Sequence, residues 1–317
     1  MPLMEIKDLR TSYFTPDGTV RAIDGVTLRL ERGHALGLVG ESGCGKTTVA
    51  LSSMKLLPSN ARIIDGAIML DGENLVTKSE KEMNKIRWKR ISLVFQGAMN
   101  ALNPVFKVGD QIVEAITTHN RSIPKSDAVE KTRELLTLVG VDPSRAQDFP
   151  HEFSGGMKQR AVIAMALACN PDILIADEPT TALDVITQAR ILELIRDLQA
   201  KLGLSLIVIT HDLSLPAEIC TEIAIMYAGK IVEYGGTSSI YSDPMHPYTK
   251  ALLGAFPSII GPIRKMETLA GFPPDLRSPP SGCRLYPRCP IAEDQCKAKE
   301  PELMEVKPGH FVACYKT

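Results

Sequence analysis

One stretch of the sequence has residue types and a spacing suited to holding phosphate. Residues 40–47, GESGCGKT, match the pattern G-x-x-x-x-G-K-S/T, follow an apolar run and open a helical pattern. In such a loop the glycines let backbone N–H groups turn toward a phosphate, Lys46 neutralises β and γ oxygens, and Thr47 offers its hydroxyl to Mg²⁺. A glycine-rich turn without a ligand would not need this strand and helix around it. We therefore expect MgATP to contact Gly40, Glu41, Ser42, Gly43, Cys44, Gly45, Lys46, Thr47 and Thr48.

A second stretch supplies acids suited to hydrolysis. DILIADEP (172–179) is an apolar run that ends in Asp177 and Glu178, and the next apolar run ends at His211. Asp177 is placed to reach Mg²⁺, whereas Glu178 is placed to orient or deprotonate an attacking water. Open α/β sheets bind ligands at the carboxyl ends of their strands. We expect Lys46, Glu178 and His211 to form a catalytic group, although His211 alone would be read as a structural histidine.

The elements around these residues indicate an α/β fold with a largely parallel sheet. Buried strands are expected at 34–40, 91–96, 172–177, 205–210 and 222–229, and helices at 46–57, 156–169 and 187–202. The first 33 residues suggest added antiparallel strands. Residues 97–150 are polar and helix-rich, as in a helical insertion. The Pro- and Gly-rich residues 236–317 suggest a separate, loop-rich extension of a domain that spans 1–235.

Composition excludes some classes of protein. Lys and Arg number 36 and Asp and Glu 37, so the net charge of −1 does not favour a general nucleic-acid binder. There is no apolar run of about 18 residues, and charges interrupt the start where a signal peptide needs an apolar core. We expect a cytosolic chain whose seven cysteines are thiols or metal ligands.

Residues 153–160, FSGGMKQR, closely resemble the signature of the ATP-binding-cassette (ABC) ATPases. The resemblance implies an ABC-type core with an antiparallel subdomain and a helical subdomain at about 97–160. It implies that Gln96 senses Mg²⁺ and nucleotide, that Asp184 crosses to a second subunit, and that Tyr13 stacks on adenine. Each has an ordinary alternative: Gln96 as a strand-end residue, Asp184 as a helix N-cap, and Tyr13 as core packing.

The signature also has a physical rationale. Ser154, Gly155 and Gly156 begin a helical pattern and present a hydroxyl, free N–H groups and a positive dipole end to an anion. In the ABC family that anion is the γ-phosphate held by the opposite subunit, so two cassettes must face each other. The chain departs from the common pattern at Phe153, Met157 and Cys44. Because Cys44 precedes a helix and lies near Lys46, we expect a lowered thiol pKa and alkylation that ATP prevents.

The tail identifies a branch of this family by resemblance. Residues 236–257 and 283–315 are similar to the C-terminal extension of the oligopeptide, dipeptide and nickel importers, and FQGAMNALNP (95–104) resembles a segment of that branch, with Gly97 and Ala98 replacing Asp-Pro. This implies that the chain lies at the cytoplasmic face of the membrane and drives the import of peptides. The implied partners are two transmembrane permease subunits, a second and related ATPase and, indirectly, an extracytoplasmic binding protein. Oligosaccharide or nickel import, a soluble ABC ATPase and a regulatory module remain alternatives.

Four cysteines of the tail are spaced as a ligand set. Cys283, Cys289, Cys296 and Cys314 follow C-x5-C-x6-C-x17-C in a segment with few apolar residues. Four thiolates suit a [4Fe–4S] cluster or Zn²⁺, and free thiols are a third possibility. The resemblance favours the iron–sulfur cluster. Cys169 and Cys220 lie in apolar helical patterns and are expected in the core.

Overall fold

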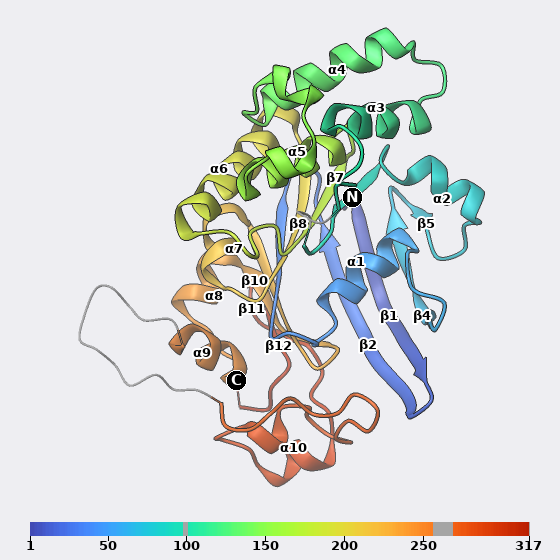
Figure 1. Ribbon diagram of the computed structural model, residues 1–317. Coiled ribbons are helices and arrows are strands. Elements are labelled where there is room, and N and C mark those ends of the chain that lie inside the picture. Colours follow the sequence, from blue (N-terminus) through green and yellow to red (C-terminus); the bar gives the residue numbers. More distant parts are fainter. Residues whose placement is uncertain (98–100, 256–268, 317) are drawn as a thin grey trace. The chain divides into compact units, whose positions relative to one another are not determined.

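The structure, a computed structural model, describes residues 1–97, 101–255 and 269–316 (Figure 1). Contacts divide the chain into two units. We call residues 1–30, 36–76 and 210–317 the phosphate-loop unit, and residues 31–35 and 77–209 the helix-rich unit. The division at residue 235 that the sequence suggested stays a prediction.

An antiparallel sheet forms one layer of the phosphate-loop unit. Its strands follow the order β2-β1-β4-β5, with β1 at Met4–Thr15, β2 at Gly18–Leu30, β4 at Ala61–Leu70 and β5 at Glu73–Asn74. A tight turn joins β1 to β2, and the pairs run from Thr15 opposite Gly18 to Met4 opposite Leu30. The antiparallel strands expected near the N-terminus are confirmed.

The same unit contains part of a second sheet. Strand β3 (Ala35–Val39) is buried throughout and runs parallel to β9 (Glu222–Tyr227), which is antiparallel to β10 (Lys230–Gly236). The phosphate loop leads from β3 into α1 (Lys46–Met54). Continuous burial explains why β3 is apolar at every position instead of alternating.

The tail adds more regular structure than its composition suggested. Strand β12 (His310–Val312) pairs with β10 and with β11 (Met304–Lys307), so it extends the sheet. The tail also forms the short helices α8 at Thr237–Ser242, α9 at Pro247–Gly254 and α10 at Asp294–Ala298, and the 3₁₀ turn η4 at Tyr286–Arg288, whereas α7 at Ser214–Ile219 precedes the tail.

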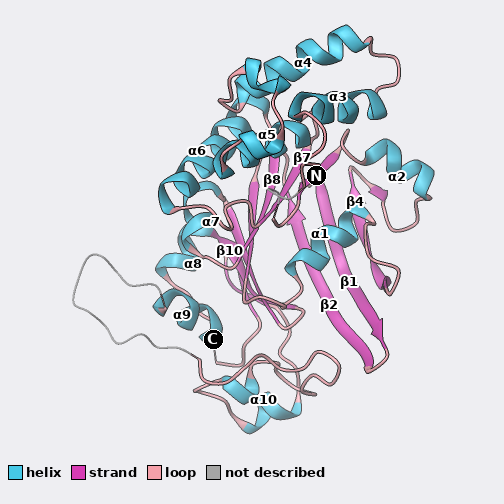
Figure 2. Cartoon of the chain, in the orientation of Figure 1, coloured by secondary structure: helices cyan, strands magenta, loops and turns pink. Residues whose placement is uncertain are grey.

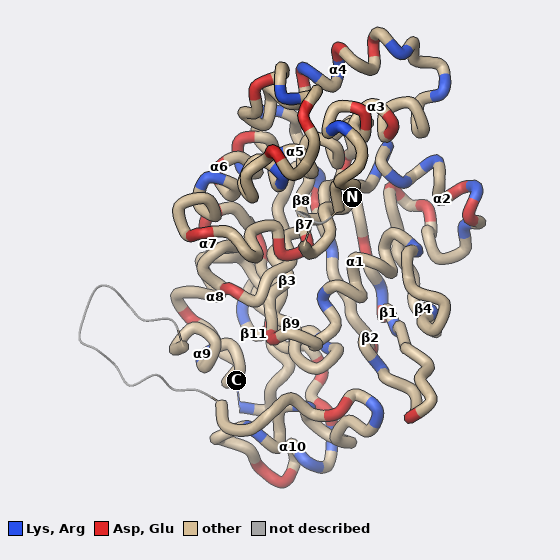
Figure 3. The backbone as a smooth tube through the Cα atoms, viewed as in Figure 1, with Lys and Arg blue, Asp and Glu red and all other residues tan. Residues whose placement is uncertain are grey.

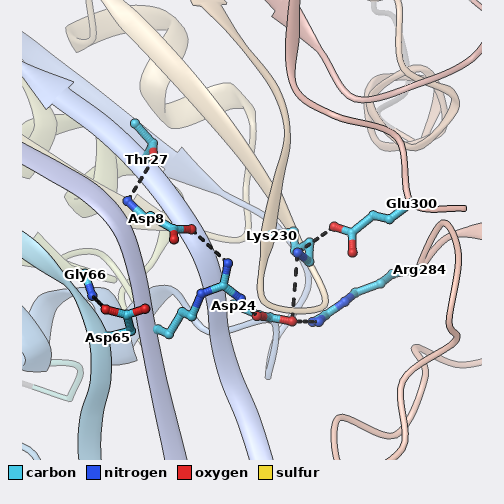
Figure 4. A network of polar contacts seen from close by, with 9 residues as sticks. Asp8, Asp24, Thr27, Asp65, Gly66, Lys230, Arg284 and Glu300 are labelled. Atoms are coloured by element: carbon cyan, nitrogen blue, oxygen red, sulfur yellow. Dashed lines mark hydrogen bonds and ion pairs between the residues drawn. The ribbon is translucent and has the colours of Figure 1, made fainter.

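Ion pairs join the tail to the antiparallel sheet (Figure 4). Asp24 of β2 accepts from Arg284, whose side chain is almost fully buried, and Arg10 donates to Asp24 over 2.5 Å. Lys230 bridges Asp24 at 3.8 Å and Glu300 at 2.5 Å. Truncating Asp24 would leave the buried Arg284 charge without this carboxylate partner, which is strongly destabilising.

The helix-rich unit is built on three parallel strands, β6 (Ile91–Val94), β7 (Ile173–Asp177) and β8 (Ser205–Thr210), which pair in the order β6-β7-β8. The helices of this unit are α2 at Glu80–Ile86, α3 at Val108–His119, α4 at Lys125–Leu138, η2 at Pro143–Gln147, η3 at Pro150–Glu152, α5 at Gly155–Ala166 and α6 at Val185–Leu202.

The strands and helices expected from the sequence are confirmed to within a few residues, and no strand occurs in the described part of 97–150 (Figure 2).

Acidic and basic residues are interspersed along the backbone (Figure 3), and their numbers are nearly equal. None of the helices in the described ranges is long and apolar enough to cross a membrane.

Candidate functional site

The phosphate loop is held in shape by glycines that no other residue can replace. A Cβ on Gly40 would lie 2.0 Å from the carbonyl oxygen of Met226, and a Cβ on Gly45 would lie 2.3 Å from that of Ala22. Gly45 also has a φ of +112°, and Gly43 a φ of +80°. These values favour glycine because a side chain would clash with its own backbone. The sequence-predicted phosphate loop therefore packs closely against β2 and β9.

The first turn of α1 presents the residues expected to bind MgATP. Lys46 is 5% exposed, and its ammonium donates to the carbonyls of Gly40 (2.7 Å) and Glu41 (3.0 Å). The adjacent Thr47 is exposed, whereas Thr48 is buried and shares a 3.2 Å hydrogen bond with the hydroxyl of Tyr13. Tyr13 thus lies beside the start of α1, and its stacking on adenine stays a prediction.

Cys44 corrects an expectation. Its side chain is only 4% exposed, and burial raises the pKa of its thiol even though Lys46 lies 3.7 Å away and opposes the shift. The nearby charge and the helix end would lower the pKa of this thiol, but desolvation disfavours the thiolate more strongly here.

A labelling experiment checks this correction. We expect iodoacetamide at pH 8 to label Cys44 in the folded chain about tenfold or more slowly than in the unfolded chain, since each pKa unit reduces the thiolate tenfold. ATP would then have little labelling left to suppress. Peptide mass spectrometry over time measures the rate, and rapid labelling at neutral pH would show that the thiol is accessible and ionised.

Two acidic residues, Asp177 and Glu178, lie at the end of β7 in the helix-rich unit. Asp177 is 2% exposed, and Glu178 follows with a φ of +46°, a backbone strain that often accompanies functional positions. The Glu178 carboxylate accepts hydrogen bonds from Gln96 Nε2 (2.9 Å) and from the Thr181 hydroxyl (2.8 Å). The structure therefore brings Gln96 and Glu178 together, although they are 82 residues apart. Thr181 is an orienting group that the sequence analysis missed.

The signature lies at the start of α5. Ser154 is its N-cap and accepts from the Met157 N–H at 3.3 Å, while Gly155 and Gly156 form the first turn. A Cβ on Gly156 would lie 2.8 Å from Thr187 Cγ2 on α6, so glycine allows the two helix ends to approach. Asp184 caps α6 by accepting from Thr187, whose hydroxyl and N–H lower the pKa of this carboxyl. The ordinary N-cap role of Asp184 is thus present, and its role toward a second subunit stays a prediction.

His211 follows β8 directly and is exposed. It belongs to the phosphate-loop unit, whereas Asp177 and Glu178 belong to the helix-rich unit. Its contribution to catalysis stays a prediction. The segment 95–104 is described except for residues 98–100, so Ala98 lies outside the described residues.

The four cysteines of the tail line one cavity, together with His246 and Tyr286. Burial raises the pKa of the thiol of Cys283 to about 11 and also raises those of Cys289 and Cys314. The Cys283 N–H donates to the Cys296 carbonyl at 2.7 Å, which joins two of the four segments. Within the described residues, no three side chains of His, Cys, Asp or Glu are placed to hold a single metal ion.

One contact to the phosphate loop could not have been expected from the sequence. Arg288 of η4 donates to both carboxylate oxygens of Glu41, 247 residues away, at 2.9 and 3.1 Å. No motif marks Arg288, and only the fold reveals it.

Comparison with known proteins decides the family. Residues 23–181 match the family model described as ABC transporter. The chain belongs to the ABC transporter family. This cassette is an ATPase whose hydrolysis is coupled to transport, with the α/β fold that the sequence indicated. It aligns with a dimeric ATP-binding cassette in a post-hydrolysis state bound to ADP and Pi at 26% identity and a TM-score of 0.67, covering 74% of this chain and 98% of that one.

Two further findings concern the branch of the family. Residues 232–296 of the cassette match the model described as Oligopeptide/dipeptide transporter, C-terminal region. It is 46% identical to the dipeptide transport ATP-binding protein DppD of Bacillus subtilis, covering 99% of this chain and 94% of that protein. It is 43% identical to the oligopeptide transport ATP-binding protein OppD of Escherichia coli, with 99% and 93% covered.

Proposed function

We propose that the cassette is the ATP-hydrolysing subunit of an importer of dipeptides or oligopeptides. The observation that carries the proposal is the combination, in one chain, of the ABC match and the peptide-transporter match of the C-terminal region. The alternatives of oligosaccharide or nickel import and of a soluble ATPase have no comparable support. We place the chain at the cytoplasmic face of the membrane, held there by its permease subunits.

We assign the chemistry to the residues that the sequence motifs mark. Lys46 and the N–H groups of the loop would bind the β- and γ-phosphates, and Thr47 and Asp177 would hold Mg²⁺, which would neutralise charge on these phosphates. Glu178 orients the water and accepts its proton, since its carboxylate is already fixed by Gln96 and Thr181. His211 steadies the γ-phosphate as charge develops on it.

Two exposed apolar pairs support the proposed partners. Val185 (79% exposed) and Ile186 (68%) follow Asp184, and we assign them to the contact with a second, related cassette whose nucleotide meets Ser154 and Gly155. Val105 (71%) and Phe106 (55%) follow the Gln96 segment, and we assign them to a permease subunit. Exposed apolar groups of this kind commonly mark interaction sites. The extracytoplasmic binding protein acts on the permeases and not on this chain.

We also propose that Cys283, Cys289, Cys296 and Cys314 hold a [4Fe–4S] cluster. A zinc ion would need four sulfurs about 2.3 Å from one point. The four thiols line one cavity, so they face the same space and could act together as a ligand set. A bound cluster would tie four segments of the tail together.

Iron content tests the cluster. We expect anaerobically purified protein to contain about four irons and four sulfides per chain with the matching visible absorption. Cys289→Ser should lower the iron content, whereas Cys169→Ser, outside the tail, should leave it unchanged. Zinc, or metal-free protein, would contradict the cluster and leave the ATPase assignment intact.

Transport assays test the cargo. The chain is co-purified with its permeases, its partner cassette and the binding protein, and the complex is placed in liposomes that contain ATP on the cassette side. The proposal predicts accumulation of a labelled dipeptide or oligopeptide and none of maltotriose or Ni²⁺. Uptake of sugar or nickel alone would replace peptide as the cargo.

A further inference from the structure

Two residues of the C-terminal tail, Arg288 and Tyr248, form hydrogen bonds with Glu41 of the phosphate loop. Both terminal nitrogens of the Arg288 guanidinium donate hydrogen bonds to the Glu41 carboxylate, at 2.9 and 3.1 Å. The Arg288 side chain is 7% exposed and that of Glu41 28%. A paired, partly buried contact of this kind is stronger and more directional than a surface ion pair.

A second group of the tail holds the backbone of the same residue. The hydroxyl of Tyr248, on α9, accepts a hydrogen bond from the Glu41 N–H at 2.8 Å. Tyr248 is fully buried and packs against Tyr227 of β9, with ring centroids 4.7 Å apart. Its ring cannot move without opening the core, so it is a rigid support for the loop.

The third contact of Glu41 leads to the nucleotide-binding lysine. The Glu41 carbonyl accepts from Lys46 Nζ at 3.0 Å, next to the 2.7 Å bond from the same nitrogen to Gly40. The side chain and N–H of Glu41 therefore face the tail, while its carbonyl orients Lys46. Glu41 is part of the phosphate loop, and its polar groups link the C-terminal tail to Lys46.

We propose that Arg288, supported by Tyr248, is a positioning residue for ATP binding, which presets the phosphate loop through Glu41. Two effects follow from the geometry. The loop is ordered before ATP arrives, which lowers the entropic cost of binding. The Arg288 charge also neutralises a carboxylate that would otherwise repel the polyphosphate at short range.

Arg288 is itself fixed by the fold of the tail. Its Nε donates to the carbonyl of Ala270 at 3.1 Å, and a terminal nitrogen lies 3.3 Å from the hydroxyl of Tyr227. Arg288 is the last residue of η4, and Cys289 follows it directly. The folded tail is thereby coupled to nucleotide affinity, a role that goes beyond the ATPase assignment and does not depend on the cargo.

Nucleotide binding and turnover test the proposal in the full-length chain. We expect Arg288→Gln to weaken binding of a fluorescent ATP analogue, and to raise the KM for ATP in the assembled transporter, by about three- to tenfold, with kcat within about twofold. Arg288→Lys should be intermediate, because an ammonium cannot make the paired contact. The matched control is Arg277→Gln, which removes a tail arginine whose partner is the neighbouring Asp275.

A double-mutant cycle separates positioning from general stability. If Arg288 acts through Glu41, then Arg288→Gln should add little to the effect of Glu41→Ala on ATP affinity. Should Arg288→Gln not fold, Tyr248→Phe must raise the KM for ATP by about two- to fivefold with the thermal midpoint near that of the wild type. Unchanged ATP affinity in the folded variants, or fully additive effects in the cycle, would overturn the proposal. Loss of peptide uptake with normal ATP affinity would count against it as well, and would point to the transport step.

Discussion

Glu178→Gln should bind ATP normally and hydrolyse it about 10²- to 10⁴-fold more slowly, which is the usual contribution of a general base. An amide oxygen can still accept from Gln96 and Thr181, so the end of β7 should keep its geometry. Without hydrolysis, the ATP-bound pair of cassettes should accumulate. Steady-state phosphate release measures the first effect, and light scattering or sedimentation with ATP measures the second.

The control for this variant is Glu193→Gln, an exposed glutamate in the middle of α6. It should hydrolyse ATP like the wild type and form no lasting pair. Turnover of Glu178→Gln close to that of the wild type would remove Glu178 from the role of base.

The second large effect is expected at Lys46. Lys46→Ala removes the ammonium that is held 2.7 Å from the Gly40 carbonyl, and with it the positive charge at the start of α1. We expect kcat to fall by about 10²- to 10³-fold, as when another preorganised donor to a developing anion is deleted, together with weaker ATP binding. Calorimetric titration with ATP and phosphate release assays measure the two effects.

Lys201→Ala, at the exposed end of α6, is the matched loss of a lysine and should change neither quantity. If Lys46→Ala bound and hydrolysed ATP normally, the loop at 40–47 would not be the phosphate site, whatever its pattern.

The sequence predicted best where local pattern determines structure. Strands β3, β7 and β8 are apolar at nearly every position because they are buried on both faces, and that signal survives in a single sequence. The phosphate loop was equally predictable from the sequence. A Cβ at Gly40 or Gly45 would lie 2.0 or 2.3 Å from a backbone carbonyl oxygen, so both positions require glycine. Such constraints act on residue type directly.

Contacts between distant segments were not predictable in this way. The pairing of Arg288 with Glu41 and of Arg284 with Asp24 joins residues more than 240 positions apart, and neither arginine belongs to a motif. The strands of the tail were missed because β11 is short and mostly exposed and β12 has only three residues, so neither carries a periodic apolar signal. The pKa of Cys44 was misjudged because the sequence shows its charged neighbour but not its burial.

ATP hydrolysis by the reconstituted transporter should be measured with and without peptide-loaded binding protein on the outer side. We expect peptide-loaded binding protein to stimulate phosphate release and Glu178→Gln in this chain to remove the stimulated rate. Hydrolysis that is indifferent to peptide, or a stimulated rate that survives Glu178→Gln, would contradict the assignment of this chain as the ATPase that drives peptide import.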